Sequence, residues 1–322
     1  SDPRTYEVQF DLYLDALEAM PYGKYLHVGG DEITAIGIDD RCKATGKTAF
    51  ELQMIWLKNV CQFAVDHGRI PIFWDDMPLK YAGIWELALS DKSEEEVVKV
   101  WNTDKLDEAI GLFPKECVYM RWKYEDATTP AHRRLLEWYH DKGLKVMGAT
   151  AASAGDSPFM PRRNTRSEYV KGFSQLADNQ LEGILATAWD DGSPHLETVW
   201  RGFIAQGEFG WNPSARDIEA FKKAHAQREY GFRPEDNRMA FLDELEKAVF
   251  LFDGALVTSG RRNPAWGTTA FTLMELPDKT KPGAWSELYK DKIAQAKIEA
   301  GRYEKIVQGI RTAEAEALRN RY

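Results

Sequence analysis

The feature that most constrains this chain is a repeated alternation of short apolar runs, polar loops and amphipathic segments. The apolar runs cover residues 25–28, 70–74, 117–122, 146–149 and 184–189, and segments with a helical period lie between them. The runs are largely apolar at every position, as in strands that are buried on both faces. Strand, loop, helix and strand in turn predict parallel βα units. Either an open doubly wound sheet or a (β/α)8 barrel satisfies this pattern.

Capping residues mark the ends of the expected helices. Asp2 can cap a first helix and Pro3 suits its first position. Gly68 and Gly143 suit the ends of two later helices. The apolar face expected of the first helix contains Tyr6, Phe10, Leu14 and Leu17. Segment 94–101 fits either state, and its run of glutamates favours helix over strand.

Composition excludes several classes of protein. The 322 residues carry a formal net charge of −9, and an acidic chain without clustered Lys and Arg is not expected to bind nucleic acid. No apolar stretch approaches the ~20 residues that span a bilayer. Cys42, Cys61 and Cys117 are widely spaced and describe neither a disulfide framework nor a zinc site. Nucleotide-binding glycine motifs are absent, so we expect neither a cofactor nor a metal.

Polar and aromatic residues gather where the expected strands end. Acid pairs follow three of the runs, at residues 31–32, 75–76 and 190–191. Three runs end in a tryptophan, namely Trp74, Trp122 and Trp189. Such a residue is often core, but at the mouth of a pocket it can form a flat wall for a sugar ring. Barrels and doubly wound sheets both build their sites at the carboxyl ends of the strands.

The segment from His27 to Glu32, His-Val-Gly-Gly-Asp-Glu, carries the most chemical information. Adjacent carboxylates at the end of a buried strand lose hydration and repel each other, which raises the pKa of one of them. A carboxylic acid that stays protonated near neutral pH can protonate a leaving-group oxygen. A bare Gly-Asp-Glu triplet is more often a solvated turn, and the longer pattern favours a catalytic loop.

The H-x-G-G-D-E pattern after a strand resembles the signature of glycoside hydrolase family 20, the β-N-acetylhexosaminidases. Two later segments resemble the same family. The fifth strand of the family is matched by Phe73-Trp74-Asp75-Asp76, and the eighth strand by Ala188-Trp189-Asp190-Asp191. Trp122-Lys123-Tyr124 resembles the sixth-strand region of the hexosaminidase D-like branch. The eighth strand of the family usually has Glu where this chain has Asp191. The resemblance covers residues 1–212 and implies a glycan or glycoconjugate substrate.

The resemblance also implies roles for individual residues. Glu32 is expected to be the general acid/base, and Asp31 to orient the 2-acetamido group whose oxygen attacks the anomeric carbon, with retention and without an enzyme nucleophile. Tyr124 is the candidate for holding the acetamido oxygen. The candidates for substrate binding are His27, Trp74, Trp122, Trp189 and Asp191. Asp190 is the alternative to Asp191, and His27 is expected to support its neighbours rather than act as an acid.

In that family the H-x-G-G-D-E strand is the fourth of the barrel. The expected fold is therefore a partial (β/α)8 TIM barrel with strands 4 to 8 only, over residues 1–212, followed by a helical region at 213–322. The missing N-terminal part of the barrel is expected in the complete protein. Two other functions stay open: a carbohydrate-binding remnant without turnover, and a glycosidase with an ordinary carboxylate nucleophile. The latter needs a carboxylate ~5–5.5 Å from Glu32, for which Asp76 and Asp191 are candidates.

Overall fold

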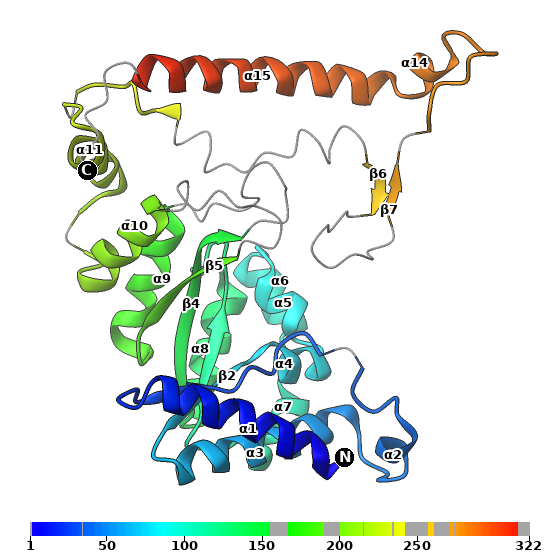
Figure 1. Ribbon diagram of the computed structural model, residues 1–322, viewed down its shortest axis with the longest axis vertical. Coiled ribbons are helices and arrows are strands. Elements are labelled where there is room, and N and C mark those ends of the chain that lie inside the picture. The colour runs from blue at the N-terminus through cyan, green and yellow to red at the C-terminus, as the bar shows by residue number, and fades with distance from the viewer. Residues whose placement is uncertain are drawn as a thin grey trace. The chain divides into compact units, whose positions relative to one another are not determined.

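A computed structural model of the chain divides into two compact units, Ser1–Thr150 with Gly172–Leu185, and Ala151–Lys171 with Ala186–Tyr322. The residues that it describes are 2–33, 35–154, 167–189, 200–214, 216–233, 235–241, 257–260, 271–273 and 275–314 (Figure 1). The predicted boundary near residue 212 stays a prediction.

The elements alternate along the chain as the sequence predicts. In order they are α1 (Pro3–Ala19), β1 (Tyr25–His27), α2 (Asp40–Lys43), α3 (Ala49–Asp66), β2 (Ile70–Trp74), α4 (Asp76–Ala82), α5 (Trp85–Leu89), α6 (Glu94–Val100), α7 (Asp104–Glu108), the 3-10 turn η1 (Ile110–Leu112), β3 (Val118–Trp122), α8 (Pro130–Asp141), β4 (Lys145–Ala154), α9 (Ser167–Gln180), β5 (Ile184–Trp189), α10 (Trp200–Trp211), α11 (Ile218–Tyr230), β6 (Val257–Gly260), β7 (Phe271–Leu273), α14 (Ala284–Leu288) and α15 (Lys290–Glu314).

One five-stranded sheet has the order β1-β2-β3-β4-β5, so neighbours in sequence are neighbours in space (Figure 1). The pairs β1–β2, β2–β3 and β3–β4 are parallel, with Tyr25 opposite Ile70 in the first and Ile72 opposite Val118 in the second. The predicted parallel βα units are confirmed. Parallel strands run in the same direction, so their carboxyl ends lie at the same edge of the sheet. The loops after β1, β2 and β3 therefore leave the sheet at that edge.

The two faces of the sheet bury different side chains, because successive residues of a strand point to opposite faces. One face forms a small cluster that contains Ile72, Val118, Met120 and Ala149, with Trp74, Trp122 and Met147 packed against it. The opposite face contributes Phe73 and Tyr119 to the main core, which it shares with α3 and α8. Burial on both faces explains why these strands lack an alternating pattern.

Local signals account for the helix ends. The Asp2 side chain accepts from the backbone N–H of Arg4 at the start of α1. Thr48 and Glu51 form a capping box at the start of α3, and Ser93 and Glu96 form another at α6. Segment 94–101, ambiguous from its period, is therefore a helix as favoured, and the Ser-x-x-Glu pattern is the signal that decides it.

The buried face of α1 differs by one residue from the prediction. Phe10 and Leu17 pack against the main core as expected, but Leu14 is 44% exposed and Tyr13 takes its place. The Tyr13 hydroxyl donates to the carbonyl of Val28 at 2.9 Å, which a leucine could not do. The first helix therefore contacts the backbone of the loop that follows β1.

The second unit is mainly helical in its described part. Phe209 of α10 and Phe221 of α11 lie in one buried cluster with Val170 and Ala205. The stretch 254–285 is rich in Gly and Pro and carries no sequence signal for a strand, yet it contains the antiparallel pair β6–β7. The sequence also predicts an apolar helix face at Phe241, Leu245, Val249 and Phe252, and all of these except Phe241 lie outside the described residues. No helix in the part of the chain that the structure describes is long and apolar enough to cross a membrane.

Candidate active site

The loop after β1 has an unusual backbone. Gly29 and Gly30 have φ of 76° and 97°, and Glu32 has φ of 51°. Glu32 is the one non-glycine residue with positive φ among those that the structure describes. For an L-residue this conformation is uncommon, and at a bulky side chain it points to a functional constraint. The loop turns sharply and leaves both Asp31 and Glu32 exposed at the carboxyl end of the strand.

Gly30 is required by close packing as well as by its dihedral angle. A Cβ atom there would lie 2.3 Å from the Phe73 ring and 2.9 Å from the Trp56 ring. The side-chain amide of Gln53 donates to the Gly30 carbonyl at 3.1 Å, and the Trp74 N–H donates to the Gly29 carbonyl at 3.2 Å. The two-glycine turn therefore lies against α3 and β2 with its backbone polar groups engaged.

Asp76 connects the loop to the next strand. Its Oδ2 atom accepts from the backbone N–H of Glu32 at 3.0 Å and from Lys80 Nζ at 2.7 Å. Asp76 is fully buried, whereas the Lys80 side chain is 33% exposed. Lys80 lies one helical turn after Asp76 in α4, so that the positive charge compensates the buried carboxylate.

The carboxyl of Asp31 is perturbed by its surroundings. Removal from water raises its pKa above the ordinary value, and the nearby Asp76 carboxylate raises it further, while Lys80 lowers it. The sequence predicts one raised pKa in the Asp31-Glu32 pair, and the direction agrees for Asp31. The neighbouring charge that contributes is Asp76, which is 45 positions away in sequence and cannot be found from spacing.

His27 is neutral in this environment. Burial lowers the pKa of its ring to about 4, and its Nδ1 accepts from the backbone N–H of Gly29 at 3.1 Å. The proton of the neutral ring is therefore on Nε2. Its ring centroid lies 4.9 Å from that of Trp74. The neutral ring thus contacts the backbone of the glycine turn, and its supporting role stays a prediction.

The aromatic candidates lie in two contacting pairs. Trp74 contacts His27, and Trp122 stacks on Tyr124 with centroids 5.1 Å apart and planes at 25°. Trp74 and Trp122 pack against the same cluster on one face of the sheet. All four are half-buried. Together with the 31–32 acid pair they gather at the ends of β1, β2 and β3, as the sequence predicts.

Lys123 fixes the end of β3 between Trp122 and Tyr124. Its Nζ donates to the Leu89 carbonyl at 2.7 Å and faces the Ala88 carbonyl at 3.4 Å. Burial lowers the pKa of Lys123 to about 8. The lysine satisfies carbonyl groups at the end of α5, which holds the strand end and the following tyrosine in place.

A buried ion pair supports the site from the opposite face of the sheet. Arg121 Nη1 donates to Asp75 Oδ1 at 3.1 Å, and the Tyr139 hydroxyl donates to Asp75 Oδ2 at 3.0 Å. Burial raises the pKa of Asp75 to about 6, although Arg121 opposes the rise. The Arg121 guanidinium lies 4.6 Å from the Trp85 ring centroid, and Lys80 Nζ lies 5.0 Å from the same ring.

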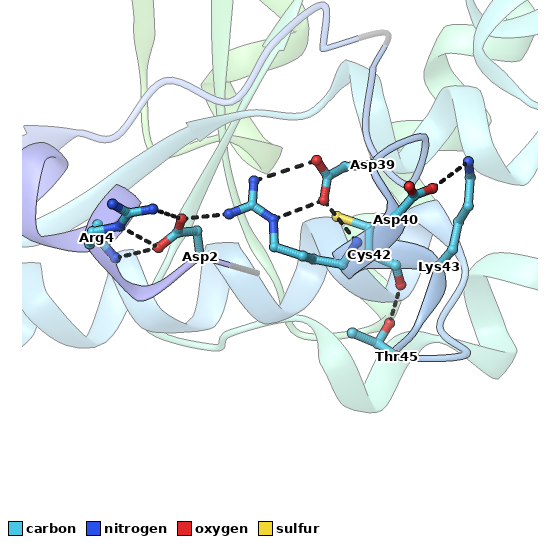
Figure 2. A network of polar contacts seen from close by, with 8 residues as sticks. Asp2, Arg4, Asp39, Asp40, Cys42, Lys43 and Thr45 are labelled. Atoms are coloured by element: carbon cyan, nitrogen blue, oxygen red, sulfur yellow. Dashed lines mark hydrogen bonds and ion pairs between the residues drawn. The ribbon is translucent and has the colours of Figure 1, made fainter.

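Surface charges hold the far part of the loop after β1. Figure 2 shows Asp2 and Arg4 at the start of α1 and Asp39 before α2. Arg41 bridges them, because its Nη1 donates to Asp2 at 2.6 Å and its Nε to Asp39 at 3.0 Å. The Arg4 and Arg41 side chains are 79% and 60% exposed. The loop is thus bound at both ends, by buried Asp76 and by this exposed network.

The remaining sequence candidates are in the second unit or outside the described residues. Trp189 ends β5 as predicted and is half-buried. Asp190 and Asp191 lie outside the described residues. No group of three His, Cys, Asp or Glu side chains that could hold a metal ion occurs in the described ranges.

Sequence reasoning missed the residues beneath the loop. It considered Asp76 as a nucleophile and did not consider Lys80 or Arg121. A usable signal was present, because an arginine within the strand Val118–Trp122 and an acid pair after another strand each need a buried partner. The identity of those partners depends on the fold.

The fold thus places paired carboxylates on a two-glycine turn at the carboxyl edge of a parallel sheet, which is where βα proteins build their sites. The profile of the glycosyl hydrolase family 20 catalytic domain matches residues 1–213. The chain therefore belongs to glycosyl hydrolase family 20.

One similar solved structure is the β-N-acetylhexosaminidase of Bacteroides fragilis NCTC 9343. It is 14% identical, with a TM-score of 0.46, and the similarity covers 77% of this chain. This chain spans 46% of the length of that one, which is less than half. No curated protein matches the chain.

Proposed function

We propose that this chain carries the acid/base part of a glycosidase that removes terminal β-linked N-acetylhexosamine, GlcNAc or GalNAc. The observation that carries the proposal is the turn that exposes Asp31 and Glu32 at the end of β1, within a chain of family 20. The two acids leave the strand end together, next to half-buried aromatic side chains of β2 and β3 that suit the apolar face of a sugar.

In this proposal Glu32 protonates the leaving-group oxygen and then deprotonates the attacking water. Asp31 accepts a hydrogen bond from the acetamide N–H and orients the acetamide oxygen toward the anomeric carbon. Tyr124 donates to that oxygen. The product forms with retention, because the acetamide oxygen displaces the leaving group and water then displaces the acetamide oxygen.

The environment of Asp76 favours this mechanism over an ordinary carboxylate nucleophile. Asp76 is fully buried and one of its oxygens already accepts from Glu32 and Lys80. A nucleophile must reach the anomeric carbon, and a carboxylate enclosed on all sides does not. The stereochemistry of the product tests Asp191, the second candidate nucleophile.

We also propose that the five strands correspond to strands 4 to 8 of a (β/α)8 barrel. The strand β1 is at an edge of the sheet, and exposed edges of long sheets are normally paired or covered. In the complete enzyme the preceding three βα units would cover that edge. They would also supply further side chains to the pocket that we propose beside Trp74 and Trp122.

The proposal is tested by Glu32→Gln in the complete enzyme, with aryl N-acetyl-β-glucosaminides of graded leaving-group pKa. General acid–base catalysis typically contributes about 10²–10⁴-fold. The loss in kcat should approach that range for poor leaving groups and shrink for good ones, which need little protonation. A rate near that of the wild type on a poor leaving group would exclude Glu32 as the acid.

Aryl glycosides that lack the acetamido group provide the control for the substrate class. A substrate-assisted enzyme should cleave them far more slowly than the acetylated ones. Equal rates would favour a carboxylate nucleophile. Binding of N-acetylhexosamine without any turnover would instead favour a carbohydrate-binding remnant.

A further inference from the structure

The conformation of Glu32 requires an explanation, because an L-residue with φ of 51° is disfavoured unless its surroundings hold it. Gly29 and Gly30 adopt their positive φ angles at little steric cost, because glycine has no Cβ. Glu32 has no such freedom. Its backbone N–H donates to Asp76 Oδ2 at 3.0 Å, and a bond to a charged acceptor is among the stronger hydrogen bonds in proteins.

We infer that Asp76, together with Lys80, is a positioning residue that sets the backbone conformation of Glu32 and thereby aims the acid/base carboxyl at the leaving-group oxygen. This inference rests on the proposed function of Glu32. Asp76 does not touch the substrate in this reading, since its carboxylate is fully buried. It contacts the acid pair through the Glu32 amide, and its charge also raises the pKa of Asp31.

Lys80 has a defined part in this arrangement. Its Nζ lies 2.7 Å from the same Oδ2 atom that accepts from Glu32, so its positive charge lies directly beside the buried carboxyl group. Lys80 is itself held over the Trp85 ring, whose edge-on neighbour at 4.6 Å is Trp122. Because Trp122 stacks on Tyr124, consecutive contacts run from the Glu32 amide to the candidate tyrosine.

The matched control is Asp107, which also accepts from a lysine at 2.7 Å. Its Oδ1 pairs with Lys142 and accepts from the Trp138 indole at 2.9 Å. Asp107 lies in α7 and makes none of these contacts with the loop after β1. Asp107→Asn therefore removes an ion pair of the same length, at a carboxyl that is 37% exposed, without removing the Glu32 contact.

The first measurement is amide hydrogen exchange of the peptide that contains Glu32, in the complete enzyme. Asp76→Asn removes the negative charge of the acceptor. Its single carbonyl oxygen would have to accept from both the Glu32 N–H and Lys80 Nζ. Exchange at Glu32 should become faster in Asp76→Asn and stay at the wild-type rate in Asp107→Asn. Unchanged exchange in Asp76→Asn would overturn the inference, whatever the activity.

The second measurement is the dependence of kcat on leaving-group pKa. A displacement of about 1 Å at a catalytic group can cost roughly 10²-fold in rate. Asp76→Asn should lose roughly this factor on poor leaving groups and much less on good ones, with KM nearly constant. In the Glu32→Gln background the same substitution should add little, because both act through one group. An equal loss on all substrates would indicate a purely structural role and overturn the inference.

Lys80→Gln decides the matter if Asp76→Asn does not fold. In Lys80→Gln, kcat should again fall more on poor leaving groups than on good ones, by a smaller factor than in Asp76→Asn. Lys80→Arg should restore the wild-type dependence of kcat on leaving-group pKa. A uniform loss in Lys80→Gln would count against the inference. If Glu32→Gln itself shows no leaving-group dependence, the proposed function fails, and the exchange measurement still judges the contact between Asp76 and Glu32.

Discussion

Gly30 provides the sharpest test of the packing beneath the candidate site. In Gly30→Ala the new Cβ would lie 2.3 Å from the Phe73 ring. Gly29→Ala is the matched control, because Gly29 also has a positive φ but has no atom within 4 Å of the added Cβ. Gly46, in the connection between α2 and α3, also has a positive φ and no atom within 4 Å of an added Cβ, so Gly46→Ala serves as a second control.

The expected losses differ because only one position combines backbone strain with a clash. A left-handed backbone costs an L-residue about 1–2 kcal/mol, and the smaller entropy of the unfolded alanine chain returns about 0.4–1 kcal/mol. The controls should therefore lose about 1 kcal/mol in free energy of unfolding. Overpacking adds about 1–3 kcal/mol, so Gly30→Ala should lose about 2–4 kcal/mol.

Urea unfolding followed by near-ultraviolet circular dichroism measures these differences, with the slope against urea checked for constancy. The Phe73 and Trp56 rings are part of the main core or packed against it, so their displacement should also change the aromatic signal of the folded state. If Gly30→Ala is no less stable than Gly29→Ala, the close approach of the turn to these rings is refuted.

Three further outcomes are expected. Asp31→Asn should slow cleavage of N-acetylated aryl glycosides far more than it lowers the unfolding midpoint. A product NMR time course should show initial retention. Initial inversion, or a glycosyl ester trapped on an Asp or Glu, would contradict substrate assistance. Trp189→Ala should weaken N-acetylhexosamine binding, measured by calorimetry, while the folded fraction stays unchanged; parallel loss of binding and folding would make Trp189 a core residue. Because the pKa of His27 falls from 6.5 to about 4 on folding, the folded state binds this proton less tightly, so stability is complete above pH 6.5 and is lost as pH falls toward 4. The loss is at most about 3 kcal/mol, and urea titrations should find it reduced in His27→Gln; identical pH profiles of the two proteins would argue that the ring is not buried.

The sequence was sufficient for the parallel βα order because the strands and main helices carry strong periodic signals. The runs that end at Trp74 and Trp122 are strands, and the acids and aromatic residues that follow them gather at one edge as predicted. The short helices α2, α4, α5 and α7 were not predicted. With four to seven residues each, they span too few turns to establish a period.

The contacts that shape the candidate site depend on the fold. The bond between Glu32 and Asp76 joins residues 44 positions apart, and no local pattern encodes it. The choice of Tyr13 over Leu14 on the buried face of α1 follows from a hydroxyl contact with the Val28 carbonyl, whereas periodicity weighs only apolarity. The assignment of Asp31 and Glu32 depended on a resemblance, since an acid pair after two glycines has several possible uses.

The two anchors of the loop after β1 should respond differently to ionic strength. At 1 M salt the Debye length is about 3 Å, and exposed ion pairs are largely screened while buried ones are not. In the network of Asp2, Arg4, Arg41 and Asp39 both arginines lie largely in solvent, while Asp2 is 17% exposed. Concentrated salt should therefore weaken the attachment of the distal part of the loop. The buried carboxylate of Asp76 would still hold the Glu32 amide. The distal end of the loop can therefore become mobile while Asp31 and Glu32 keep their positions. The acid pair would then tolerate salt even though the segment that carries it loses rigidity.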